Sequence, residues 1–132
     1  MKHTLLLFFL ILACLCSGFS HADKHQDKLL CAITEVIDCG RLGECVLLLP
    51  EQANLPDFIT IDLKSNKITG HDRDHSEEIR HEKTVDNNII LKGVSGNGRG
   101  WSLLISDDRA TISGAAVGDE YTFSFFGACK PH

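Results

Sequence analysis

The chain has 132 residues, of which 43% are hydrophobic and 23% charged, and 18 Asp/Glu against 13 Lys/Arg give a formal net charge of −5. This length suits a single domain with one modest core. An acidic chain lacks the basic face that nucleic-acid binding requires, so DNA and RNA are excluded as expected partners.

Residues 1–22 predict a secretory signal peptide. They carry Lys2, run apolar over 5–16, and end in a small-x-small triplet at 20–22. The apolar run is shorter than the roughly 20 residues that a membrane-spanning helix needs, so we expect no transmembrane span in the mature chain. An alternative stays open, because residues 11–14 resemble a bacterial lipobox in which Cys14 would carry the lipid anchor.

Cleavage after Ala22 would leave residues 23–132 as a single β domain, periplasmic or secreted. It would remove two of the six cysteines and Lys2, so the net charge would change from −5 to −6. The remaining four cysteines form no Cys-x-x-Cys motif, which excludes thioredoxin-like and zinc-ribbon spacings. In an oxidising compartment, an even number of cysteines predicts two disulfides.

The mature chain shows a succession of short strand patterns. Apolar residues alternate with a period of two around 29–37, 45–49, 59–63 and 101–105. Turn-forming sequences separate the patterns: "GRLGE", "PEQANLP", "KSNK", "DNN", "SGNG", "SDDR" and "VGDE". We therefore predict an all-β fold, a small antiparallel meander of about eight strands. A closed or nearly closed barrel is preferred because it leaves no free edge, with a β-sandwich as the alternative.

The bulky residues of these patterns are expected to point inward and to leave little cavity. They are Ile33, Ile37, Leu47, Leu49, Ile61, Leu91, Trp101, Leu103, Ile105, Phe123 and Phe125. Trp101 shares its parity with Leu103 and Ile105, so it is expected in the core rather than on an exposed binding face. A filled interior favours binding at the outer surface.

The cysteine positions favour one pairing. A hairpin between residues 32–37 and 46–49 would align Cys39 with Cys45 and make a local disulfide. Cys31 and Cys129 would then join the first predicted strand to the last, as barrel closure requires. The other two pairings of four cysteines stay open at this stage.

The sequence resembles a family of small exported proteobacterial proteins that carry paired cysteines and have no characterised activity. The likeness rests on the N-terminal cysteine trio, on "GRGWSLLIS" over 98–106 and on "FGAC" over 126–129. It implies an exported bacterial protein with paired cysteines. It implies no activity, ligand or catalytic residue.

Two groups of histidines suit Cu²⁺ or Zn²⁺. His71, His75 and His81 lie among carboxylates in "HDRDHSEEIRHE", a segment that is otherwise expected to be a solvated loop. Cleavage after Ala22 would also create an N-terminus with His25 third. There the free amine, two amides and the imidazole could hold Cu²⁺ in a square plane.

No motif predicts catalysis, so the protein is not expected to be an enzyme. "GNGRG" has no following helix to bind phosphate and is interpreted as a hairpin turn. Ser95 lacks the strand-turn-helix context of a nucleophile elbow. The acidic pairs at 107–108 and 119–120 are expected in solvated turns.

Two functional hypotheses follow. The first is a non-enzymatic binding module of the bacterial cell envelope whose partner is a protein, a glycan or a lipid. The second is a periplasmic copper- or zinc-binding protein that uses His25, the His71/His75/His81 segment, or both.

Overall fold

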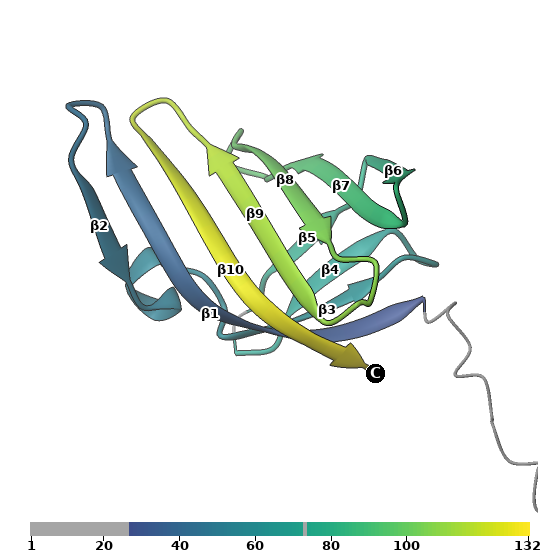
Figure 1. Cartoon of the computed structure of the whole chain (residues 1–132). Coiled ribbons are helices and arrows are strands. Elements are labelled where there is room, and N and C mark those ends of the chain that lie inside the picture. The colour runs from purple at the N-terminus through teal and green to yellow at the C-terminus, as the bar shows by residue number, and fades with distance from the viewer. Residues whose placement is uncertain (1–26, 73) are drawn as a thin grey trace, which may run out of the picture.

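The computed structural model describes residues 27–72 and 74–132. The expected signal peptide, Cys14 and His25 therefore lie outside the described residues. Within the described ranges the chain forms ten strands, a short 3-10 helix and no α-helix (Figure 1). The elements are β1 (Lys28–Gly40), β2 (Cys45–Leu48), η2 (Pro50–Ala53), β3 (Phe58–Asp62), β4 (Lys67–Gly70), β5 (Ser76–Glu78), β6 (His81–Val85), β7 (Asn88–Val94), β8 (Gly100–Ile105), β9 (Thr111–Val117) and β10 (Tyr121–Pro131).

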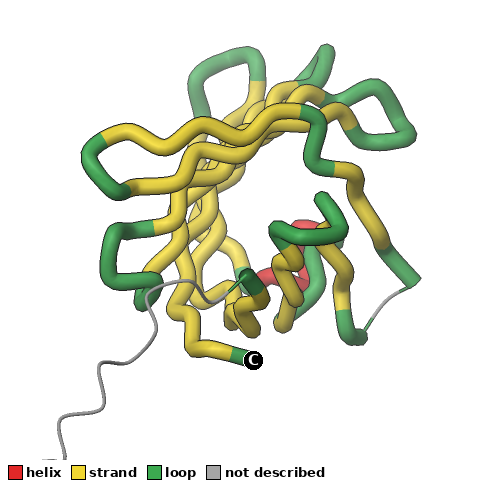
Figure 2. The backbone as a smooth tube through the Cα atoms, turned by 90° about the vertical axis from the view of Figure 1, so that its right-hand side faces the viewer, coloured by secondary structure: helices red, strands yellow, loops and turns green. Residues whose placement is uncertain are grey.

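The strands form one antiparallel sheet that curls into a half-barrel (Figure 2). Nine strands follow the order β5-β4-β3-β1-β10-β9-β8-β7-β6, and β2 pairs with β1 off this path. The two ends of the path, β5 and β6, are consecutive in the chain. Between them, the Ile79 N–H donates to the Asn66 carbonyl on one side and the Arg80 N–H donates to the Lys92 carbonyl on the other, each at 2.9 Å. The antiparallel, barrel-like fold predicted from the sequence is confirmed.

The turns lie where the sequence places them. In a two-residue hairpin loop, both central residues adopt positive φ in a type I′ turn, and Asp86 and Asn87 do so between β6 and β7. Elsewhere positive φ falls on the turn sequences already identified, at Gly43, Asn54, Asn66, Gly98 and Arg109. Asparagine and glycine tolerate this region best, which explains most of these positions.

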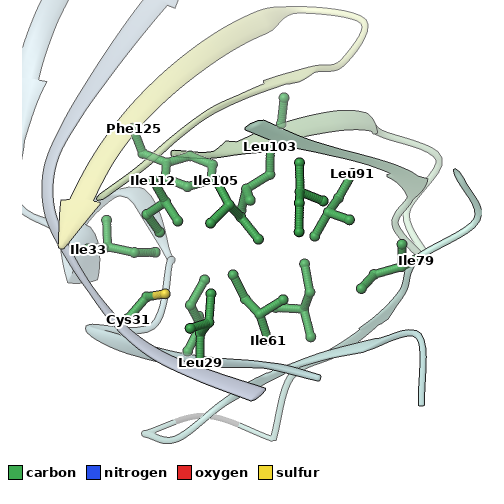
Figure 3. Packing of buried hydrophobic residues seen from close by; sticks show 14 of the residues in the cluster. Leu29, Cys31, Ile33, Ile61, Ile79, Leu91, Leu103, Ile105, Ile112 and Phe125 are labelled. Atoms are coloured by element: carbon green, nitrogen blue, oxygen red, sulfur yellow. The ribbon is translucent and has the colours of Figure 1, made fainter. Parts of the chain in front are cut away.

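The core lies inside the curled sheet (Figure 3). Leu29, Ile61, Leu91 and Ile105 are fully buried there, and they come from β1, β3, β7 and β8. Each such side chain contributes roughly 1.5 to 3 kcal/mol by leaving water. The alternating patterns of the sequence therefore supply the inner face of the sheet.

A β-bulge in β1 reverses the expected faces of its second half. Ile33 pairs with Gly127 and Glu35 pairs with Phe126, so Thr34 is an extra residue in β1. Val36 is consequently fully buried, while Ile37 is only half-buried. The expectation that Ile37 belongs to the core is wrong, because strict alternation does not continue through a bulge.

The same shift turns β2 outward. Ile37 pairs with Leu47 as predicted, but this pair lies on the outer face, and Leu47 is 71% exposed. Leu49, which follows β2, is also exposed. The core positions predicted for Leu47 and Leu49 are therefore wrong. Strand β2 extends the sheet beside β1, and only Leu48 of this strand packs against the core.

Both disulfides join neighbouring strands. Cys31–Cys129 links β1 to β10 within the pairing of the first and last strands, and Cys39–Cys45 links β1 to β2. These are the two pairs that the cysteine positions favour. Cys31 is fully buried, so the first bond is part of the core.

Candidate functional site

Side chains of β8, β9 and β10 form rows across the inner face of the half-barrel. Two rows follow from the strand register, and a third follows from contacts at the strand ends. From the core outward, the rows are Leu103 with Gly114 and Phe125, Trp101 with Ala116 and Phe123, and Arg99 with Gly118 and Tyr121. Large side chains of β8 and β10 thus flank glycine or alanine on β9.

A cavity of about 470 Å³ lies above the core along these rows, and we call it the β9 cavity. Ala116 on β9 lines this space between its register partners Trp101 and Phe123, whereas the ring of Phe125 covers Gly114. The apolar residues of the wall come from β1, β3, β4, β8 and β10, and include Ile33, Ile59, Ile68, Leu103, Phe123 and Phe125. The sequence-based expectation of little cavity is therefore wrong.

The sequence contains one sign of this cavity that the alternation of apolar residues alone does not reveal. The inward positions of "GAAVG", residues 114–118, are glycine, alanine and glycine. Counting apolar residues on the neighbouring strands predicts a filled interior, because the small side chain of Ala116 between them is not considered. The volume depends on which strands lie side by side, and the register supplies that information.

Two glycines fix the aromatic walls of the cavity. A Cβ on Gly93 of β7 would lie 2.2 Å from Cζ2 of Trp101, and a Cβ on Gly114 would lie 2.4 Å from Cζ of Phe125. Each ring therefore occupies the space above a glycine.

Trp101 faces inward with Leu103 and Ile105 as predicted, but it is half-buried and lines the cavity. Its Nε1–H is buried and has no hydrogen-bond partner among the described residues.

Arg99 stands at the rim of the cavity. Its Cζ lies 4.6 Å from the ring centroid of Tyr121, and its Cγ would contact a Cβ on Gly118 at 3.5 Å. Stacking of a guanidinium on an aromatic ring restrains the side chain. In the part of the chain that the structure describes, no carboxylate lies within ion-pair distance of Arg99.

Strand β5 and the residues just before it contribute the acidic part of the rim. His75 Nε2 lies 3.0 Å from Glu77 Oε1, and the Glu77 side chain is only 12% exposed. Asp74 also lines the cavity and is exposed. Polar groups of Ser95 and Asn97, in the turn between β7 and β8, complete the rim.

The histidines proposed as metal ligands do not converge. His71 Nε2 lies 2.6 Å from Thr60 Oγ1, His75 pairs with Glu77, and His81 is exposed on β6 opposite Lys92. Among residues 27–72 and 74–132, no three His, Cys, Asp or Glu side chains are grouped to hold a metal ion. The N-terminal copper site at His25 stays a prediction, because that residue lies outside the described ranges.

The remaining sequence motifs form turns. "GNGRG" connects β7 and β8, where Gly98 has a φ of 84° and the Arg99 N–H donates to Asn97 Oδ1 at 3.3 Å. The acidic pairs occupy the turns between β8 and β9 and between β9 and β10. Ser95 lines the β9 cavity but has no helix after it. The hairpin interpretation of "GNGRG" is confirmed.

A second, smaller cavity of about 280 Å³ is lined by Asp27, Lys64, Glu82 and Arg109 among others. Nη1 of Arg109 is buried there and lacks a hydrogen-bond partner within the described residues. The charges of both signs around this space, and its small size, make it a weaker candidate than the β9 cavity.

No protein-family model, curated protein or solved structure matches the chain. Within residues 27–72 and 74–132, no helix is long and apolar enough to cross a membrane.

Proposed function

We propose that the protein is a non-enzymatic binding module of the bacterial cell envelope that holds a small, mainly apolar ligand in the β9 cavity. The observation that carries this proposal is the cavity itself. Small-molecule sites usually occupy about 300 to 1,000 Å³ and combine apolar walls with a few polar groups. The β9 cavity has a volume of about 470 Å³, walls of aliphatic and aromatic side chains, and a polar rim.

Two disulfides support an exported location, because such bonds persist in oxidising compartments. Among the partner classes expected from the sequence, a lipid-like molecule suits the cavity best. The polar groups of a glycan could bind at the rim, but deeper in the cavity its hydroxyl groups would meet aliphatic and aromatic side chains, and unpaired polar groups are costly when they are buried.

Binding of a neutral apolar probe tests the proposal. N-phenyl-1-naphthylamine, which brightens in apolar surroundings, should bind the oxidised protein saturably. Ala116→Phe fills the cavity from its floor and should abolish this binding. Ala116 lines the cavity but is itself buried, so Ala116→Leu provides a milder second variant.

The neighbouring residue supplies a matched control. Ala115 lies on the same strand but is exposed on the outer face, so Ala115→Phe should leave probe binding intact. Probe binding that survives in both Ala116 variants, with their thermal unfolding still cooperative, would exclude the β9 cavity as the binding site.

A further inference from the structure

We infer that the ligand of the β9 cavity is a single-chain amphiphile with an anionic head, a carboxylate or a phosphate monoester, and that Arg99 binds this head. The inference rests on the proposed function and adds the chemical class of the ligand. It comes from the charge, position and neighbours of Arg99.

Among the described residues that line the cavity, Arg99 is the only lysine or arginine. It adjoins the row of Trp101, Ala116 and Phe123, at the point where the apolar wall meets the rim. A guanidinium offers up to five N–H donors and pairs with carboxylate or phosphate through two parallel hydrogen bonds. In the described structure its charge has no carboxylate partner. Arg99 can therefore receive an anion without first breaking an ion pair.

The position of Arg99 is set before any ligand arrives. Tyr121 lies under the guanidinium, and Gly118 leaves space for the aliphatic part of the side chain. A side chain that is already restrained loses less conformational entropy on binding. A residue other than glycine at position 118 would place its Cβ in contact with Arg99.

The acidic groups of the rim lie on another segment. Glu77 of β5 lies 3.0 Å from His75 and is mostly buried, and Asp74, just before β5, is exposed. An anionic head would be attracted by Arg99 and repelled by Asp74, so it should lie on the β8 to β10 side. A cationic head would have to approach an unpaired guanidinium at a half-buried position, which makes it the less favourable ligand.

The apolar part of the ligand follows from the narrow opening at Ala116. This residue of β9 lines the cavity and pairs with Trp101 on one side and Phe123 on the other, while the Phe125 ring covers Gly114. A linear chain fits a gap of this kind better than a fused-ring body does. Head and chain would then contact Arg99 and the floor of the cavity at the same time.

Trp101 is the only tryptophan of the chain and lines the cavity, so its emission reports binding directly. Dodecanoate, dodecyl phosphate and dodecyltrimethylammonium should be titrated below their micelle concentrations, with displacement of N-phenyl-1-naphthylamine as a second measurement. We expect each anion to bind about tenfold more tightly than the cation, the effect of one charged hydrogen-bonded contact. The relative affinities of dodecanoate and dodecyl phosphate distinguish a fatty-acid ligand from a phospholipid-derived one.

Arg99→Gln should reduce the affinity for both anions about tenfold and leave binding of the neutral probe unchanged. Arg99→Lys should retain part of the anion affinity, and Asp74→Asn should increase it. Lys92→Gln is the matched control, because it removes an equal charge from the outer face of β7.

The outcomes separate the two proposals. If the neutral probe binds and Ala116→Phe abolishes this binding, but Arg99→Gln and Lys92→Gln affect dodecanoate equally, the anionic head is wrong and the binding cavity stands. Equal affinities for the anions and the cation would overturn the inference in the same way. If neither the probe nor any amphiphile binds, the proposed function itself fails.

Discussion

The indole of Trp101 occupies the space directly above Gly93. A Cβ at position 93 would lie 2.2 Å from Cζ2 of the ring and 2.7 Å from the carbonyl oxygen of Glu78. Gly93 therefore has the indole on one side and the backbone at the end of β5 on the other. Trp101 fills the region where β5 and β7 approach each other near the two ends of the curled sheet.

Gly93→Ala should destabilise the protein by about 1 to 3 kcal/mol, the range found when a packed site receives an extra methyl group. Moving the ring cannot relieve the contact completely, because the Glu78 carbonyl belongs to the backbone. The emission of Trp101 in the folded state should change as well. Urea unfolding, followed by Trp101 fluorescence, measures both effects.

Gly100→Ala provides the control for this prediction. Gly100 is also in a strand, but a Cβ there has no neighbour within 4 Å, so the substitution should change stability by less than about 0.5 kcal/mol. Equal destabilisation by the two substitutions would show that loss of glycine, rather than contact with Trp101, determines the effect.

Much of the fold can be predicted from local sequence. The alternation of Trp101, Leu103 and Ile105 correctly gives the inward face of β8, because that strand is regular along its length. The turns are predictable because asparagine, aspartate and glycine mark the positive-φ positions except Arg109. The pairing of Cys39 with Cys45 follows from a short hairpin, which contains its own register.

The remaining features depend on interactions between distant segments. The bulge at Thr34 arises where β1 pairs with β10, far away in the chain, and no local pattern marks it. The β9 cavity requires the register of three strands, and Arg99 becomes a site residue only when β8 and β10 bring it over Tyr121. The histidines at 71, 75 and 81 are close in sequence, yet strand pairing directs them to different partners.

The bulge predicts an unusual order of mutational effects in β1. Val36→Ala should destabilise the protein by about 2 kcal/mol, because a fully buried side chain leaves a cavity. Ile37→Ala removes a larger side chain but should cost below about 1 kcal/mol, because Ile37 is half-buried on the outer face. Chemical denaturation of both variants tests this order. A greater loss of stability for Ile37→Ala than for Val36→Ala would indicate that β1 alternates strictly, and it would contradict the bulge.

The two disulfides should contribute unequally to stability. They close loops with sequence separations of 98 and 6. In the chain-entropy model, these correspond to roughly 4 to 5 kcal/mol for Cys31–Cys129 and about 2 kcal/mol for Cys39–Cys45. Urea unfolding of the two double alanine variants, each with the other bond intact, measures the difference. Similar losses would indicate that the pairing of β1 with β10 persists in the unfolded ensemble.

The turn between β8 and β9 gives a prediction about acid stability. The Ser106 hydroxyl donates to Asp108 Oδ1 at 2.5 Å, and the Ala110 N–H donates to the same oxygen at 2.9 Å. These bonds, the one from Ser106 foremost, lower the pKa of Asp108 below its ordinary value of 3.8. When the pKa of a carboxyl is lower in the folded state, the stability it contributes is present above the unfolded-state pKa and is lost as the pH falls through the folded-state pKa.

The wild type should therefore be more stable than Asp108→Asn at neutral pH, and the difference should disappear as the pH falls below 3.8 toward 2. Denaturation midpoints of both proteins across this range measure the change. Asp107→Asn is the matched control, because it removes the same charge from the adjacent residue and leaves these two hydrogen bonds in place. If it shows the same pH-dependent difference, the effect comes from net charge rather than from the hydrogen bonds of Asp108.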